Sequence, residues 1–293
     1  MAFSVLSIQV QLHAQHQKTQ VLEKELESVI APYKATVGIA VIDIEKNEHF
    51  QVNGGRRYPM QSVFKFPLAL CILDMVDHGR LRLDEIVHIK KEKLDKDTWG
   101  PLVQDHPDQD IDISVHDLLR YSVSKSDNNA CDILFSLAGG PKKVNDYIHS
   151  AGIKDIAIVA TEREMQAAWQ VQYTNWCQPD AMAELLRLFF EGNLLSSQSN
   201  DLLMDIMTKS ENSDKRIKGL LPPDVLVAHK TGTSGANKDG LRAATNDVGI
   251  ITLPDGRHIA LVVFVSDFKG APSYAEKIIA QVGNCVWNHF KNK

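Results

Sequence analysis

Ser62 and Lys65 lie three residues apart at the start of a long apolar segment, Phe66 to Val76. On a helix this spacing places both side chains on one face, one turn apart. A serine hydroxyl becomes a good nucleophile when a base takes its proton, and a lysine amine can be that base when its surroundings lower its pKa. By itself the pair is more typical of a serine helix cap followed by a solvated lysine, so its meaning depends on the rest of the chain.

Two further groups of polar side chains follow the first. The triplet Ser126-Asp127-Asn128 offers a hydroxyl and an amide, although alone it is typical of a turn that caps the next helix, Asn129 to Ala138. The run KTGTSG at 230–235 follows an expected strand, and alone it is typical of a strand that ends in a glycine-rich turn. Its glycines would also let a ligand approach the backbone closely. The three groups in this order form a much stronger signal than any one of them.

The composition excludes several classes of function. With 293 residues, 44% hydrophobic and 24% charged, the chain has an ordinary globular profile. The net charge is −5 and no basic block is present, so we expect no nucleic-acid partner. No apolar run reaches the roughly 18 residues that indicate a membrane helix. The cysteines and histidines lack the spacing of a metal site, so no metal is expected; Cys71 and Cys131 are expected to be buried, and no disulfide is predicted.

The first 19 residues are ambiguous. Met1 to Ala14 is mildly apolar and carries no Lys or Arg. This pattern is typical either of a shortened secretion signal or of a disordered lead.

Strand-like segments lie towards both ends of the chain, with helices between them. The expected strands are Thr36–Ile44, His49–Asn53, Val225–Lys230, Asp247–Leu253 and His258–Val265. One sheet can recruit both ends of a chain, so we predict an α+β fold. Its antiparallel sheet would be flanked by terminal helices at 20–30 and 273–290. Residues 20–61 with 211–293 would form an α/β domain, and residues 62–210 an inserted all-helical domain, with the site in the crevice between them.

The helical region has two irregular features. Pro67 predicts a distortion near Ser62, because proline removes a backbone hydrogen bond and crowds the carbonyl four residues earlier. Residues 160–177 show neither helical nor strand periodicity, and such a stretch inside a compact region is often functional. By contrast, Ser114 before an apolar-periodic segment predicts a capped helix start.

The motifs S-x-x-K, S-D-N and K-T-G together are the signature of serine penicillin-recognising enzymes. The chain resembles the class A β-lactamases over about residues 20–293, and most of all the PER-, VEB- and TLA-type extended-spectrum branch. The resemblance extends to Trp99–Pro101, to Met182–Ser196 and to Ala243–Asp247. It implies a serine β-lactamase and penicillin-binding transpeptidase-like fold, and hydrolysis of the β-lactam amide of penicillins and cephalosporins, extended-spectrum ones included, which gives antibiotic resistance.

Glu162 is the residue that the resemblance makes decisive. The family's loop carries a Glu followed four residues later by an amide, and together they hold the hydrolytic water; here they are Glu162 and Gln166. Glu164 is the alternative. Two positions depart from the family, since Ala160 replaces an Arg and Asp132 replaces an Asn. Both changes predict a loop folded differently from the common form.

The resemblance also implies a role for each polar residue. Ser62 forms the acyl-enzyme after losing its proton to Lys65, or to Glu162 through a water. The backbone N–H groups of Ser62 and Thr233 form the oxyanion hole. Ser126 passes a proton to the leaving nitrogen, and Lys230 lowers the cost of charge nearby. The implied substrate-binding residues are Trp99, Asn128, Gln166, Arg216, Thr231, Gly232, Thr233 and Ser234, with Arg216 alternatively a surface residue.

Other functions share these motifs. A penicillin-binding D-Ala-D-Ala peptidase would acylate without fast hydrolysis, and a β-lactam sensor domain would bind covalently and signal. Glu162 favours the hydrolase, because the peptidases lack the deacylating carboxylate. The resemblance further implies a small-molecule β-lactam substrate, no cofactor, a monomer and a periplasmic location. The segment 235–240 looks like an enlarged strand connection, which predicts a roomier site.

Overall fold

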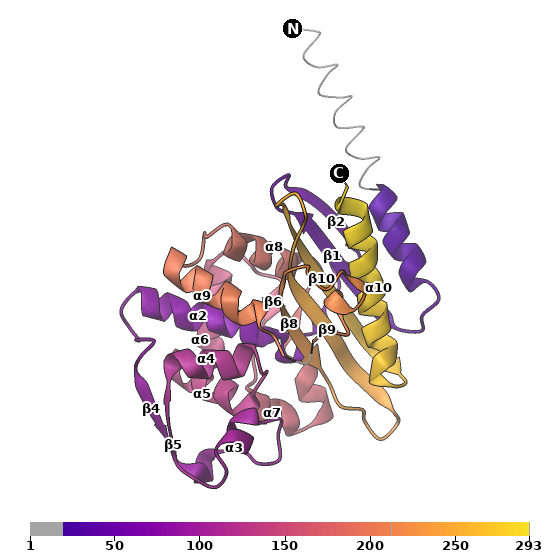
Figure 1. Ribbon diagram of the computed structural model, residues 1–293. Helices are drawn as coiled ribbons and strands as arrows, with labels where there is room; N and C mark the ends of the chain where they lie inside the picture. Colours follow the sequence, from indigo (N-terminus) through magenta and orange to yellow (C-terminus); the bar gives the residue numbers. More distant parts are fainter. Residues whose placement is uncertain (1–19, 212, 293) are drawn as a thin grey trace.

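The computed structural model describes residues 20–211 and 213–292, so the expected signal or lead at 1–19 lies outside the described residues. A five-stranded antiparallel sheet has the strand order β2-β1-β10-β9-β8 (Figure 1). Its strands are β1 (Thr36–Asp43), β2 (Glu48–Val52), β8 (Val227–Thr233), β9 (Leu241–Thr252) and β10 (His258–Lys269). Thr36 of β1 pairs with Ser266 of β10. The prediction that one sheet joins both ends of the chain is therefore confirmed.

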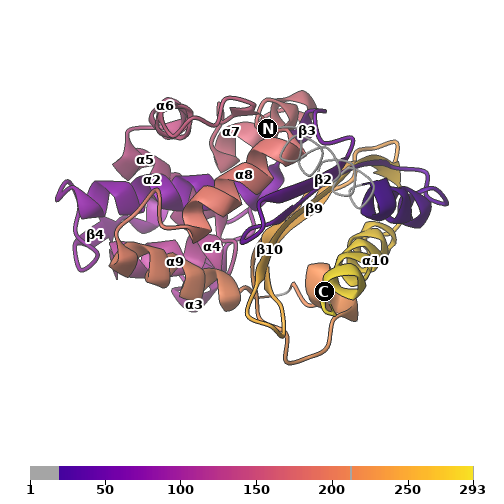
Figure 2. The same ribbon diagram turned by 90° about the horizontal axis from the view of Figure 1, so that it is seen from above.

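Both faces of this sheet are covered by helices (Figure 2). On one face, Ile39, Val41 and Leu261 are buried in a cluster with α10 (Pro272–Phe290) and the helix at 20–30. On the other face, alternate residues such as Ala40 and Val262 join the larger cluster that contains the remaining helices. Because both faces are buried, β10 has a nearly continuous apolar sequence instead of an alternating one.

The chain between β2 and β8 is mainly helical. The α-helices are α2 (Lys65–Asp77), α3 (Pro101–Asp105), α4 (Val115–Val123), α5 (Asn128–Ala138), α6 (Pro141–Ser150), α7 (Glu162–Gln166), α8 (Pro179–Phe190) and α9 (Ser197–Thr208). Short strands are β3 (Tyr58–Pro59), β4 (Ile86–Ile89), β5 (Ile111–Ser114), β6 (Ile156–Ala157) and β7 (Trp176–Cys177). Short 3-10 turns are η1 (Gln61–Phe64), η2 (Lys91–Lys93), η3 (Trp169–Tyr173) and η4 (Ile217–Leu220). Helix α2 lies at the centre, with its residues from Lys65 to Leu73 buried.

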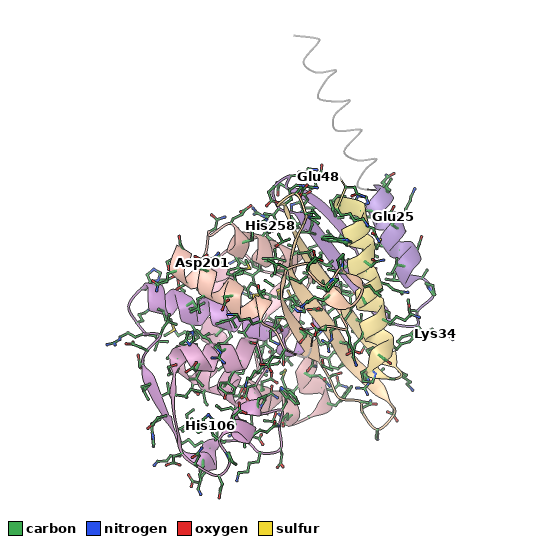
Figure 3. The ribbon with its side chains drawn as sticks, in the orientation of Figure 1. Glu25, Lys34, Glu48, His106, Asp201 and His258 are labelled. Carbon is green, nitrogen blue, oxygen red and sulfur yellow. The ribbon has the colours of Figure 1, made fainter. Side chains whose placement is uncertain are left out.

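Side chains follow the expected division between core and surface. Charged residues such as Glu25, Lys34 and Asp201 are exposed on the outside (Figure 3). Cys71 and Cys131 are buried, as predicted, and all four cysteines are free thiols. Within 20–211 and 213–292, no helix combines the length and apolar character needed to cross a membrane.

Several predicted strand boundaries were wrong. β8 does not end in a glycine-rich turn after Lys230 but continues to Thr233, because Gly232 and Thr233 pair with β9. β9 begins at Leu241, before the expected Asp247, and β10 runs on to Lys269. These extensions carry alanine and polar residues, and the strand pairing stabilises them where apolar periodicity is lacking. The distortion expected from Pro67 is present, since Ser62 lies in the 3-10 turn η1 and α2 begins only at Lys65.

Candidate active site

A cleft of about 450 Å³ lies between the helical region and the edge strand β8. This volume falls in the range of small-molecule sites. Most residues predicted from the sequence to bind substrate or react line it, namely Ser62, Trp99, Ser126, Asn128, Glu162, Gln166, Arg216, Thr231, Gly232, Thr233 and Ser234. The fold thus brings together groups from η1, the start of α5, α7 and β8. Around this cleft, among the described residues, no three metal-binding side chains are placed to hold an ion.

Ser62, Lys65 and Glu162 form a closed triangle of contacts. Ser62 Oγ donates to Glu162 Oε1 at 3.1 Å, and Lys65 Nζ donates to Ser62 Oγ at 3.0 Å. Lys65 Nζ also lies 2.8 Å from Glu162 Oε1. Lys65 is fully buried and Glu162 is 6% exposed. The nucleophile candidate therefore contacts both groups that can accept its proton.

Lys65 is held by the S-D-N segment as well. Its Nζ donates to the Ser126 carbonyl oxygen at 2.8 Å and to Asn128 Oδ1 at 2.6 Å. Ser126 adopts a left-handed backbone with φ of 58°, a conformation that is uncommon for a residue with a side chain and that clusters at functional sites. The next residue, Asp127, caps α5 and accepts from Ala130 N and Leu102 N, both at 2.7 Å. The expected turn cap is confirmed, and it fixes the loop that presents Ser126.

Lys230 reaches the same point from β8. Its Nζ donates to Ser126 Oγ at 2.9 Å and to the Thr231 carbonyl oxygen at 2.9 Å. Burial, together with the positive charges of Lys65 and Arg216, lowers the pKa of Lys230 well below its ordinary value. Lys65, Lys230 and Arg216 thus bring three buried basic side chains to one region of the cleft, which suits an anionic ligand.

Helix α7 presents Glu162 and turns Glu164 away. Thr161 and Glu164 form a capping box, in which Glu164 Oε2 accepts from Thr161 N at 2.8 Å. Glu164 is exposed, whereas Glu162 faces the cleft. The stretch predicted to lack periodicity thus contains one helical turn, one 3-10 turn and a two-residue strand.

Asp132 anchors the start of α7. Its carboxylate accepts from Glu162 N at 2.8 Å and from Arg163 N at 3.0 Å. A carboxylate at a helix N-terminus is favourable, because the first N–H groups of the helix have no partner within it. Burial raises the pKa of the Asp132 carboxyl to about 6. Asp132, which stands where the family has an Asn, therefore holds the backbone of Glu162, the candidate base.

Asn175 closes the same loop in the absence of an arginine at Ala160. Its Oδ1 accepts from Val159 N at 2.7 Å and from Ala160 N at 2.9 Å, and its Nδ2 donates to the Ala160 carbonyl oxygen at 2.7 Å. The Asn175 carbonyl oxygen accepts from Met60 N at 2.9 Å, two residues before Ser62. Asn175 thus links both ends of the loop to each other through its neutral amide, and links them through its carbonyl oxygen to the segment that carries Ser62.

Thr98 joins the two amides of the cleft. Its Oγ1 accepts from Asn128 Nδ2 at 2.7 Å and from Gln166 Nε2 at 2.6 Å. The neighbouring Trp99 is 52% exposed at the rim, and its Nε1 donates to the Lys125 carbonyl oxygen at 3.0 Å. The sequence singled out both amides and Trp99 but not Thr98, whose contribution depends on a contact across the cleft.

Strand β8 lies directly against η1, the turn that contains Ser62. A methyl group on Gly232 would lie 2.5 Å from the Met60 carbonyl oxygen and 3.2 Å from Val63 N. The sequence predicted a ligand close to the backbone of Gly232, but the group that approaches it is the backbone of the turn at Met60–Val63. Gly235 faces open space. Ser234 is buried, and its Oγ accepts from Ala244 N at 3.0 Å.

Arg216 is buried, so the alternative of a surface arginine was wrong. The side chain is 6% exposed and lines the cleft. Its guanidinium donates to the carbonyl oxygens of Gly232 at 3.0 Å and Asn246 at 2.7 Å, and to Thr233 Oγ1 at 2.5 Å. All three acceptors are neutral.

Sequence reasoning missed residues whose roles depend on contacts with residues distant in the sequence. They include Asn175, Thr98 and the pair Gln61 and Gln172, whose side chains bond at 2.8 Å beside Ser62. The only sequence signal was the position of Gln172 and Asn175 within the aperiodic stretch. Asp132 was noted as a departure, but its contact with α7 was not foreseen.

The contacts of the Ser62 hydroxyl with Lys65 and Glu162, beside an antiparallel sheet, are typical of one class of enzyme. Residues 20–290 match the Beta-lactamase enzyme family, and the chain belongs to this family as a class A serine β-lactamase. It is 44% identical to the extended-spectrum β-lactamase PER-1 of Pseudomonas aeruginosa, over 92% of this chain and 87% of that protein.

Two solved structures are similar along nearly the whole chain. A β-lactamase from Chitinophaga pinensis has a TM-score of 0.89 and 46% identity, covering 91% of this chain and 98% of that one. The TLA-1 extended-spectrum β-lactamase has a TM-score of 0.91 and 46% identity, covering 93% of this chain and 99% of that one. The resemblance deduced from the motifs and the predicted α+β fold are both confirmed.

Proposed function

We propose that this enzyme hydrolyses the β-lactam amide of penicillins and cephalosporins, extended-spectrum cephalosporins included, and so gives antibiotic resistance. The observation that carries the proposal is the position of Ser62 Oγ, within hydrogen-bond distance of both Lys65 Nζ and Glu162 Oε1. One of these two groups can remove the Ser62 proton for attack, and Glu162 can later activate the water that hydrolyses the Ser62 ester.

In the first half of the reaction, Ser62 Oγ attacks the lactam carbonyl carbon and the ring C–N bond breaks. The proton leaves Ser62 for Lys65 directly, or for Glu162 through a water. The backbone N–H groups of Ser62 and Thr233 stabilise the oxyanion, and losing one such donor typically costs about 3 kcal/mol. Ser126, in contact with Lys230, donates a proton to the departing nitrogen. The product of this half is a Ser62 ester.

In the second half, water attacks the ester carbonyl carbon and releases Ser62. Glu162 takes a proton from this water and returns it to the departing Ser62 Oγ, which it contacts at 3.1 Å. Gln166, four residues later on α7, is the second residue that holds the water. General base catalysis of this kind typically contributes about 10²–10⁴-fold. The position of Glu162 supports hydrolysis over the D-Ala-D-Ala peptidase and the sensor domain.

Substrate binding follows from the charges and amides of the cleft. Arg216 and Lys230, with the hydroxyls of Thr231 and Thr233, suit the substrate carboxylate. Asn128 suits the side-chain amide of the substrate. The remaining substrate-binding candidates are Trp99 at the rim, Gly232 and Ser234.

The proposal includes how and where the enzyme acts. Residues 20–61 with 211–293 would form one domain and residues 62–210 the other, with substrate bound between them. Family membership supports action as a monomer in the periplasm.

Steady-state turnover of a chromogenic cephalosporin tests the function. We expect many product equivalents per enzyme. One equivalent of product followed by no further reaction would overturn the proposal and favour an enzyme that only acylates.

A further inference from the structure

A buried group of polar side chains lies behind the cleft and does not face the substrate. Ser213, His229 and Asp247 are each at most 1% exposed. His229 Nε2 lies 2.9 Å from Ser213 Oγ, and His229 Nδ1 lies 3.0 Å from each oxygen of Asp247. The hydroxyl is too deeply buried to act on a substrate, so the arrangement must serve another purpose. We call these three residues the buried clamp.

The buried clamp grips one short segment at both ends. Ser213 is itself the first residue of this segment, 213–217. At the other end, Asp247 Oδ2 accepts from Ile217 N at 3.0 Å. Arg216 lies between these two points, and its backbone N donates to the Ser213 carbonyl oxygen at 3.2 Å. The backbone at Arg216, with φ −106° and ψ −123°, lies outside the regular helix and strand regions.

Two glycines make room for this arrangement. A methyl group on Gly249 of β9 would lie 2.5 Å from His229 Cβ, so the absence of a side chain there lets the imidazole lie over the strand. A methyl group on Gly283 of α10 would lie 2.7 Å from the Ile217 carbonyl oxygen. The segment 213–217 is thus closely packed between the sheet and α10.

Among residues 20–211 and 213–292, no carboxylate forms an ion pair with Arg216. Its guanidinium donates only to neutral oxygens, and its Nε is buried without a hydrogen-bond partner. The negative charge that acts on it most is that of Asp247, followed by Glu276. Hydrogen bonds to β8 and β9 hold the guanidinium, and the backbone of 213–217 sets the point from which the side chain reaches them.

We propose that Ser213, His229 and Asp247 are positioning residues that hold the 213–217 segment so that Arg216 faces the cleft and binds the substrate carboxylate. This inference rests on the proposed function. None of the three lines the cleft, so we expect the buried clamp to act mainly through Arg216, with a weaker electrostatic influence of Asp247 on Lys230. Loosening it should weaken the binding of ground state and transition state together, which raises KM and leaves kcat nearly unchanged.

Steady-state kinetics with a carboxylate-bearing cephalosporin tests the inference. Ser213→Ala and Asp247→Asn should each raise KM about tenfold, the effect of one weakened charge-assisted hydrogen bond, with kcat within about threefold. Ser122→Ala is the matched control, because Ser122 Oγ is buried and has no hydrogen-bond partner in the part of the chain that the structure describes, and it should leave KM unchanged. In an Arg216→Ala background, the same two changes should raise KM no further.

Three results separate the outcomes. Unchanged KM in a folded Ser213→Ala variant, or effects that add to those of Arg216→Ala, would overturn the inference while hydrolysis stands. Wild-type enzyme without turnover would overturn the proposed function itself. Esterifying the cephalosporin carboxylate should abolish the KM difference between wild type and Ser213→Ala, and a persisting difference contradicts the inference. If Asp247→Asn fails to fold by circular dichroism, Ser213→Ala decides alone.

Discussion

Lys65 Nζ lies 2.8 Å from Glu162 Oε1, and the Lys65 side chain of this ion pair is fully buried. Both members also contact the Ser62 hydroxyl. Breaking a buried pair leaves an uncompensated charge, so neither residue can be removed without an effect on the other. For variants of Glu162, both the covalent adduct that accumulates on the enzyme and the rate of turnover must therefore be measured.

Glu162→Ala should accumulate a covalent adduct, because deacylation loses its general base. We expect turnover to fall by about 10²–10⁴-fold. Intact mass measured after mixing with a cephalosporin should show the added substrate mass. Glu164→Ala is the control: it removes an exposed capping side chain, so it should cost about 1 kcal/mol of stability with turnover preserved. Trapping by Glu164→Ala together with normal turnover by Glu162→Ala would reverse the assignment.

Asp132→Asn should alter the pH dependence of stability. Burial raises the pKa of Asp132 to about 6, so the folded state favours the protonated acid. The stabilisation is fully present below the unfolded pKa and is lost as pH rises through about 6. Relative to the variant, wild type should lose about 3 kcal/mol between pH 3 and 7.5. Urea unfolding of both proteins across this range measures it.

The control for this experiment has the opposite sign. Asp146 on α6 is exposed, and hydrogen bonding by Lys142 lowers its pKa. Its small contribution is present above the unfolded pKa and is lost as pH falls, so Asp146→Asn should not reproduce the Asp132 result. Parallel stability curves for wild type and Asp132→Asn would contradict the prediction.

Gly232→Ala should displace β8 from the turn that carries Ser62. The new methyl group would meet the Met60 carbonyl oxygen, which as backbone cannot move aside easily. We expect kcat/KM to fall about 10²-fold and the free energy of unfolding to fall by about 1–3 kcal/mol. Gly235→Ala faces open space and should change the free energy of unfolding by no more than about 0.5 kcal/mol. Equal stability of the two variants would refute the steric argument.

Asn175→Ala should loosen the loop that carries Glu162. Three backbone groups of Val159 and Ala160 lose their partner, and each buried unsatisfied group costs about 1–3 kcal/mol. We expect lower stability in urea unfolding and slower deacylation, visible as adduct by intact mass. Asn145→Ala removes one bond to a backbone group, Ile158 N, and one long 3.5 Å contact with His149 Nδ1, and should cost about 1 kcal/mol with normal turnover. An Asn175→Ala variant as stable as wild type would show that the loop closes by other contacts.

The sequence predicted the sheet and most reactive residues, because both leave local signals. Apolar runs such as His258–Val265 identified the central strands, and three short motifs marked Ser62, Ser126 and Lys230. The capping box at Thr161 and Glu164 also has a local signal, yet Glu164 was treated only as an alternative base. The contacts of Asp132 and Asn175 have no such signal, because their partners lie across the fold. Likewise, the start of β9 at Leu241 depends on its neighbours in the sheet.

The pairing of β1 with β10 also has a consequence for how the chain folds. Thr36 meets Ser266 in the middle of the sheet, so β1 lacks this neighbour until almost the entire polypeptide has been synthesised. The helices from α2 to α9 can become compact earlier, while an unpaired apolar strand remains open to association with other chains. Sheet completion by the last-made strand is therefore expected to limit the rate of folding, and chains truncated before His258 should aggregate.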